Sequence, residues 1–485
     1  MASTDPARPN VVVILTDDQG CWAMGCAGNP EIRTPSLDRL AATGMRCDHF
    51  FCSSPVCSPA RCSLLTGRIP SQHGVHDWIR EGNVDSEKDT AIEYLRGQLG
   101  YTDVLAANGY RCGMSGKWHM GDSARPQKGF THWYTHAFGG GPYYNAPMIR
   151  DGKLHTEPRY VTDAITDDAL SYLDACAADG AQPFYLSVHY TAPHSPWDKA
   201  NHPDGLYESY DDCPFESCPD LPVHPWQANS APRGTGEKRR AILKGYFTAV
   251  TAMDACVGRI LDKLESMGVR DNTLVLFLSD NGMNMGHHGV FGKGNGTFPL
   301  NMYDTSVKIP ALLSRPGHVP EGVVCDAMLS QYDWMPTLLD YLGMDSPEAE
   351  RLPGASFAPL LRGEPFEQPE SIVVFDEYGP VRMIRTREWK YVHRYAYGPH
   401  ELYHLVNDPD ETENLVDDPA RRPIVEEMKA RLDGWFVRYA DPRLDGTKEA
   451  VTGKGQLLLA GPAGNGRKAF GDDWCYLDAD GNRRT

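Results

Sequence analysis

Residues 57–61, with the sequence CSPAR, place a thiol, a helix-start signal and an arginine within five positions. Ser58 suits the N-cap of a helix and Pro59 suits its first turn, so we expect a helix that continues from Ala60 to Leu65. Cys57 would then lie at the positive end of the helix dipole, which favours an anionic group. The segment therefore predicts a nucleophile in an anion-binding site, with Arg61 one turn away.

Two pairs of oxygen-bearing side chains each follow a short apolar run. Asp17 and Asp18 come directly after residues 10–16, and Asp280 and Asn281 come directly after residues 273–279. Either pair alone is as consistent with capping of the next element. Two pairs at matching strand ends instead favour a cation site, because crowded carboxylates need compensating positive charge. Oxygen ligands without sulfur or imidazole suit Ca²⁺, with Mg²⁺ as the alternative.

Basic side chains occupy three further segments. Lys117 and His119 are two residues apart in a segment that we expect to be extended, so both would point to the same side. His194 follows the apolar run 183–190, and Lys293 lies in a glycine-rich loop soon after Asn281. Each of these groups alone is as typical of a surface or a loop. Their positions at strand ends predict that they share one site with the carboxylates.

The elements that must position these residues alternate between strands and helices. The runs 10–16, 183–190 and 273–279 are typical of buried parallel strands, and helical patterns cover residues 35–43, 160–178 and 238–267. We therefore predict an α/β fold with a large central, mostly parallel sheet flanked by helices. Such sheets bind ligands beyond the carboxyl ends of their strands, where the polar residues described above lie.

The pattern changes near residue 370, so we predict a catalytic domain at 1–369 and a smaller C-terminal domain at 370–485. Short strands are expected at 371–375, 381–385 and 390–393, followed by a helix at 422–439. These elements predict a C-terminal α+β domain built on a short antiparallel sheet. Residues 132–158 and 195–236, rich in Gly, Pro and aromatic residues, are expected to form long loops that shape a site.

Composition excludes several classes of partner. The chain has 485 residues and a net charge of -18, which disfavours nonspecific binding to nucleic acid or to an anionic membrane. No run of eighteen apolar residues occurs, and the first ten residues lack the regions of a signal peptide. We therefore expect a cytoplasmic protein as the chain is given, with export as the alternative if a leader was removed. The thirteen cysteines include no C-x-x-C pair and are expected to be reduced thiols.

Six motifs in order along the chain resemble the formylglycine-dependent sulfatases of the alkaline-phosphatase-like superfamily: TDDQG, CSPAR with LLTGR, GKWHMG, TAPHSPW, SDNG and GKG. The resemblance spans residues 10–310, and RTREWKY and ELYHL extend it to about residue 415. It implies an alkaline-phosphatase-like fold and sulfatase activity. It also implies that a formylglycine-generating maturation enzyme oxidises Cys57 to formylglycine, whose hydrate attacks sulfur.

The resemblance also assigns roles to the polar residues. Cys57, as formylglycine, would share a metal with four oxygen ligands, namely Asp17, Asp18, Asp280 and Asn281. Arg61 would steady the hydrate, while Lys117 and His119 would bind the sulfate and the nucleophile. His194 or Lys293 would protonate the leaving alcohol, and both would contact the substrate.

Substrate choice should depend on residues outside these motifs. Aromatic side chains beside charged ones suit a sugar, and the candidates are residues 76–80, with His76 and Trp78 first, residues 139–145, Trp197 and Arg382. We therefore expect a sulfated carbohydrate, with 6-O-sulfated N-acetylhexosamine or galactose first. Two alternatives stay open: a phosphodiester or phosphonate monoester hydrolase of the same superfamily, and a noncatalytic binder of sulfated glycans in which Cys57 remains a thiol.

Overall fold

A ten-stranded sheet forms the centre of the protein. The computed structural model describes residues 8–87, 89–180, 182–367 and 374–484. The strand order is β12-β2-β11-β8-β1-β7-β3-β4-β5-β6. In chain order the strands are β1 (Asn10–Thr16), β2 (Met45–Phe51), β3 (Arg111–Lys117), β4 (His132–His136), β5 (Ala146–Arg150), β6 (Lys153–Glu157), β7 (Phe184–His189), β8 (Thr273–Ser279), β11 (Ala311–Ser314) and β12 (Val323–Ser330).

The middle of this sheet, from β8 through β1, β7 and β3 to β4, is parallel, as predicted. Alternate residues of β1 enter two different hydrophobic clusters, with Val11, Val13 and Leu15 on one face and Val12 and Ile14 on the other. A strand buried on both faces needs apolar residues at every position, which explains its continuous apolar run.

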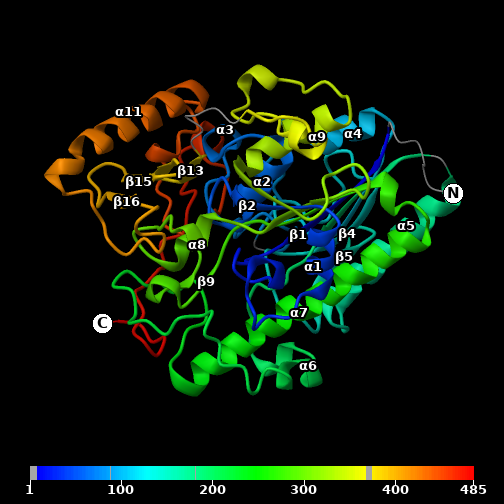
Figure 1. The fold of residues 1–485 in the computed structure, drawn as a ribbon, viewed down its shortest axis with the longest axis horizontal. Coiled ribbons are helices and arrows are strands. Elements are labelled where there is room, and N and C mark those ends of the chain that lie inside the picture. Colours follow the sequence, from blue (N-terminus) through cyan, green and yellow to red (C-terminus); the bar gives the residue numbers. More distant parts are fainter. Residues whose placement is uncertain (1–7, 88, 181, 368–373, 485) are drawn as a thin grey trace.

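Helices cover both faces. Helices α1 (Pro35–Ala42), α5 (Val161–Asp179) and α7 (Gly236–Ser266) pack on the face of Val12, and their bounds lie within two residues of the predicted ones. On the opposite face lie α2 (Cys57–Thr66) and α9 (Trp334–Tyr341) (Figure 1).

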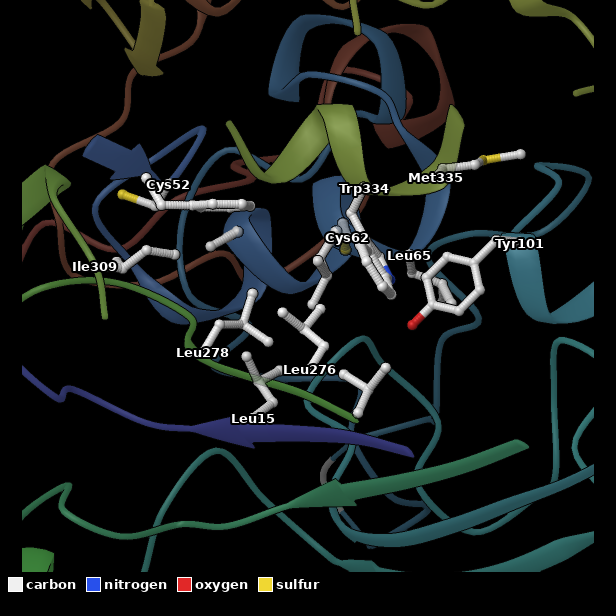
Figure 2. Packing of buried hydrophobic residues seen from close by; sticks show 14 of the residues in the cluster. Leu15, Cys52, Cys62, Leu65, Tyr101, Leu276, Leu278, Ile309, Trp334 and Met335 are labelled. Atoms are coloured by element: carbon white, nitrogen blue, oxygen red, sulfur yellow. The ribbon is translucent and has the colours of Figure 1, made fainter. Parts of the chain in front are cut away.

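Figure 2 shows Cys62 and Leu65 of helix α2 beside Trp334 of α9, in the same cluster as the Leu276 and Leu278 side chains of β8. This packing places the first turn of α2 near the carboxyl end of β8.

The shorter elements are α3 (Pro70–His73), α4 (Tyr101–Ala107), α6 (Asp204–Glu208), α8 (Asp304–Val307), α10 (Ala358–Leu361), β9 (Asn284–Met285) and β10 (Phe291–Gly292).

A second, antiparallel sheet lies C-terminally, with α11 (Arg422–Tyr439) packed on it, on the far side of the molecule from α5 (Figure 1). Its strands are β13 (Val374–Tyr378), β14 (Val381–Arg385), β15 (Trp389–Arg394) and β16 (Glu401–His404). The predicted strand at 381–385 and helix at 422–439 match these bounds. The predicted domain boundary at 369/370 and the start of the strand at 371–375 lie outside the described residues.

The prediction of a loop at 132–158 was wrong. This segment contains β4, which extends the parallel part of the sheet, and the antiparallel strands β5 and β6 at its edge. Strands of five residues interrupted by turns show too little alternation to stand out in the sequence. None of the thirteen cysteines forms a disulfide bond. Within the described residues, no helix has both the length and the apolar character needed to cross a membrane.

Candidate active site

The two oxygen-rich pairs meet at the carboxyl edge of the sheet. Strands β1 and β8 are parallel neighbours with Thr16 opposite Ser279, so the residues that follow them come together. Carboxylate oxygens of Asp17, Asp18 and Asp280 lie within 4.8 Å of one another, and Asn281 Nδ2 donates a hydrogen bond of 2.8 Å to Asp18 Oδ1. All four side chains are buried.

Each aspartate is paired with one buried cation. Lys117 Nζ contacts Asp17, Lys293 Nζ contacts Asp18, and Arg61 Nε donates to Asp280 Oδ2 over 2.9 Å. Burial by itself lowers the pKa of Lys293, but the neighbouring carboxylates raise it by more, so this lysine stays protonated. The three carboxylates are therefore compensated by side chains, and charge crowding alone does not call for a metal here.

Two unpartnered oxygens show that the cluster nevertheless fits a divalent cation. Asp17 Oδ1 and Asn281 Oδ1 are buried and have no hydrogen-bond partner. A buried acceptor without a partner is costly, and an ion coordinated there would satisfy both atoms. The donor set contains only oxygen, which suits Ca²⁺ or Mg²⁺.

Helix α2 begins two residues earlier than the sequence indicated, at Cys57 rather than at Pro59. The N-cap is Val56 rather than Ser58, because Ser58 Oγ accepts a hydrogen bond from the Ile79 amide instead of capping the helix (2.9 Å). Burial raises the pKa of the Cys57 thiol, and the nearby Lys117 and Lys293 only partly oppose this. An unmodified Cys57 therefore remains a protonated thiol, which is a poor nucleophile.

The two histidines reach the site from loops. His119 follows the end of β3 and has a φ of 53°, so the expected extended segment stops at Lys117. Its Nε2 bonds to the Ile79 carbonyl (2.8 Å), its Nδ1 has no partner, and burial lowers its pKa well below 6.5. His194 Nδ1 bonds to the Ser195 carbonyl (2.7 Å), and its Nε2 lies 3.7 Å from Asp18 Oδ2.

A cavity of about 330 Å³ opens above this cluster. Cys57, Asp18, His119, His194 and Lys293 all line it. The remaining polar residues assigned to the site, Asp17, Arg61, Lys117, Asp280 and Asn281, are fully buried and do not line the cavity. Predicted side chains from five separate segments thus converge on a single pocket.

The sequence profile of the sulfatase family matches residues 9–344, more than half of the chain. The chain belongs to the sulfatase family. A second profile, the C-terminal region of N-sulphoglucosamine sulphohydrolase, matches residues 286–436. Membership of the family makes the protein a sulfuric ester hydrolase and implies a formylglycine and a divalent metal in its active site.

Relatives and solved structures support this assignment. An N-acetylglucosamine-6-O-sulfatase of Bacteroides thetaiotaomicron is 27% identical, with 93% of this chain and 90% of the relative aligned. Human arylsulfatase A is 30% identical over 84% of this chain and 83% of the relative. A solved complex with the substrate D-glucosamine-2-N,6-O-disulfate shares the fold with a TM-score of 0.77 and 24% identity, covering 91% of this chain and 100% of that one.

Of the predicted substrate contacts, Trp78, Trp197, Gly139 and Gly140 line the sulfatase cavity. His76 does not, which corrects the sequence prediction. It is fully buried and packs edge-on against Phe470, with the two ring centroids 6.4 Å apart, so it contributes to the packing of the interior.

Arg382 and Tyr143 also have structural roles. Arg382 forms ion pairs with Glu377 (2.9 Å) and Asp445 (2.8 Å), and does not line the cavity. Tyr143 is buried and donates a hydrogen bond of 2.9 Å to the His194 carbonyl. It therefore fixes the His194 loop rather than contacting substrate.

Several cavity residues belong to no motif. Asn229 and Ser230 lie in the predicted loop 195–236, whereas Asn83, Asn295, Gly453 and Lys454 had no signal in the sequence. Gly453 and Lys454 come from the C-terminal tail, which showed neither periodicity nor resemblance. The only local sign is that Gly453-Lys454-Gly455 repeats the Gly-Lys-Gly pattern around Lys293.

Proposed function

We propose that this sulfatase hydrolyses a sulfate ester of a sugar, with Cys57 converted to formylglycine. The observation that carries the substrate class is the wall of the cavity. Trp78 offers an aromatic ring, while Asn83 Oδ1 and Ser230 Oγ are buried without hydrogen-bond partners. An aromatic ring on which a sugar can stack, beside polar atoms that lack hydrogen-bond partners, suits a ligand with many hydroxyl groups better than a plain aryl group.

The position of the sulfate is proposed from the relatives. The Bacteroides thetaiotaomicron relative is named for a 6-O-sulfated N-acetylglucosamine, and the ligand of the solved complex carries a 6-O-sulfate. A 6-O-sulfated N-acetylhexosamine or galactose is therefore the first substrate to test.

The metal site is assigned to Asp17, Asp18, Asp280 and Asn281, with Ca²⁺ favoured over Mg²⁺ because Ca²⁺ accepts several carboxylate ligands in an irregular arrangement. When bound, the ion supplies positive charge that stabilises the developing charge on the sulfate. The formylglycine hydrate supplies the nucleophilic hydroxyl.

Residues of the chain perform the remaining steps. The unpartnered Nδ1 of the neutral His119 ring can accept the proton of the attacking hydroxyl. Lys293, held protonated by Asp18, donates a hydrogen bond to a sulfate oxygen. Arg61 and Lys117, which are buried beneath the cavity, hold the Asp280 and Asp17 carboxylates in place. His194, which lines the cavity, delivers a proton to the departing alcohol.

A panel of sulfated sugars, an aryl sulfate and a phosphate diester tests the substrate class. We expect sulfate release from the 6-O-sulfated hexosamine or galactose at a higher kcat/KM than from the aryl sulfate, and no comparable phosphate ester hydrolysis. Mass spectrometry of the peptide containing Cys57 should show the aldehyde form. A thiol at full occupancy, or turnover confined to the aryl sulfate, would contradict the proposal.

A further inference from the structure

The tail segment around Lys454 is built into the wall of the active-site cavity. Gln456 N donates to the Trp78 carbonyl (2.7 Å), and Arg80 N donates to the Gln456 carbonyl (2.9 Å). The Gln456 side chain adds a hydrogen bond to the Gly74 carbonyl (3.0 Å). These bonds fix the tail against the segment that carries Trp78, although about 380 residues separate the two in the chain.

Glycines on either side of Lys454 make this close approach feasible. Gly453 and Gly455 have φ values of 79° and 94°, in the left-handed region. A Cβ atom on Gly455 would lie 2.7 Å from Arg80 Cβ, and one on Gly453 would lie 2.8 Å from Asn295 Cβ. The backbone therefore fits tightly, and Lys454 is the one side chain of this tripeptide available to the cavity.

Lys454 is a buried cation without a carboxylate partner. The residue is 8% exposed, and its Nζ donates a single hydrogen bond, to the Asn229 carbonyl (2.9 Å). Among the described residues, no carboxylate forms an ion pair with it. Burial lowers its pKa, and the nearest acidic groups, Asp473 and Asp77, only partly counteract this. Two of its three donor positions are free for a ligand.

The acidic groups near Lys454 are already bound elsewhere. Asp77 accepts hydrogen bonds from Tyr378 Oη (2.6 Å) and the Gly455 amide (3.0 Å). Asp473 pairs with Arg80, which also lines the cavity and whose side chain is 38% exposed. The wall at this point therefore holds two cations and two carboxylates, but only Arg80 and Asp473 form an ion pair, and Lys454 has no ion-pair partner among the described residues.

We propose that Lys454, with Arg80 beside it, forms a second anion-binding subsite that takes an anionic substituent of the sugar other than the sulfate being hydrolysed. The substituent is a second sulfate or a uronate carboxylate. This inference rests on the proposed function, because it names the charge pattern of that same substrate. An ammonium held in a partly desolvated wall gains most from a ligand that completes its ion pair.

Paired substrates and paired variants test the subsite. Sulfate release is measured for a 6-O-sulfated hexosamine, for the same sugar with a second sulfate, and for the same sugar linked to a uronic acid. The variants are Lys454→Met, which keeps the aliphatic stem, and Lys468→Met as the matched control. Lys468 is also in the tail, pairs with Asp472 and is absent from the cavity wall.

We expect the parent and Lys468→Met to favour at least one doubly anionic substrate over the monoanionic one by about tenfold or more in kcat/KM, because charge-assisted hydrogen bonds are the stronger ones. Lys454→Met should lose this preference and keep its rate on the monoanionic sugar. The two doubly anionic arms identify whether sulfate or carboxylate is the preferred group. Raising the ionic strength should reduce the preference of the parent.

Two results would overturn the subsite while leaving the proposed function intact: no preference in the parent, or an equal loss on all three substrates in Lys454→Met. Absence of sulfate release from every sugar would overturn the proposed function, and this inference with it.

Discussion

Cys57 combines a reactive location with an unreactive thiol. The residue begins α2 and faces the cavity, yet burial raises its pKa and keeps the sulfur protonated. The raised pKa agrees with the formylglycine that membership of the sulfatase family implies at this position. Activity should depend on the modified residue and not on a thiolate.

Replacing Cys57 with alanine tests this dependence. We expect Cys57→Ala to reduce sulfate release by at least about a thousandfold, because loss of a nucleophile removes the covalent route. The matched control is Cys62→Ala in the same helix, whose side chain packs in the core and whose loss costs about 1 kcal/mol of stability. Both variants should show the far-UV circular dichroism of the parent. Substantial turnover by Cys57→Ala would exclude Cys57 as the source of the nucleophile.

At the scale of elements, the docked tail determines the shape of one cavity wall. The pairing of Gln456 with Trp78 and Arg80 requires a glycine at position 455, where a Cβ would overlap Arg80. Gly466 lies in the same tail with a φ of 71° and has no atom within 4 Å of its would-be Cβ. The two glycines therefore share the backbone strain and differ in the space around them.

We expect Gly455→Ala to lower the free energy of unfolding by about 1–3 kcal/mol more than Gly466→Ala, because only the first adds a steric clash. Denaturant unfolding of both variants measures the difference. Sulfate release from the sugar substrate should fall only in Gly455→Ala. Equal destabilisation by the two substitutions would show that the tail does not pack as tightly as described.

The same junction has a pH dependence that comes from Asp77. Burial raises the pKa of this carboxyl to about 6, although Tyr378 donates a hydrogen bond to it. Because the pKa is higher in the folded state than the ordinary value of 3.8, the protonated form stabilises the fold. This contribution is fully present below about pH 4 and is lost as the pH rises through about 6, amounting to about 3 kcal/mol.

Melting curves of the parent and Asp77→Asn from pH 4 to pH 7 test this. The melting temperature of the parent should fall relative to that of the variant as the pH rises across this range. A constant difference between the two proteins at every pH would contradict a raised pKa for Asp77.

The sequence predicted those elements whose signal is local. Strands β1 and β8 are continuous apolar runs because both faces are buried, and the carboxylates that follow them mark the edge of the sheet. The wall formed by Lys454 could not be predicted, since its position depends on hydrogen bonds to a segment about 380 residues away. His76 was wrongly predicted to contact the substrate. It lies in the same loop as Trp78, but the His76 side chain is buried in the interior, whereas Trp78 lines the cavity.

At the scale of the whole molecule, metal binding should couple the two central strands. The cluster joins the ends of β1 and β8, so an ion bound there stabilises only the folded chain. Saturating Ca²⁺ at about 100 times its Kd would add about 2.7 kcal/mol. We expect chelation to abolish sulfate release and lower the melting temperature, and added Ca²⁺ to restore both.

Asp17→Asn serves as the control, because it keeps the shape of the side chain and removes one charged ligand. Its melting temperature should respond to Ca²⁺ much less than that of the parent. A calcium response that is the same in both proteins would place the ion elsewhere, and a better response to Mg²⁺ would change the identity of the metal.

The contribution of the tail to the cavity has a consequence for the order of events during synthesis. Lys454 follows Cys57 by about 400 residues, and a ribosome adding about 5–20 residues per second takes roughly 20–80 s to cover that distance. During this interval Cys57 has already been made, but the wall that encloses it in the folded protein has not. A maturation enzyme of the kind that the family implies would therefore meet an incomplete pocket during this interval, because the last wall of the pocket lies late in the chain.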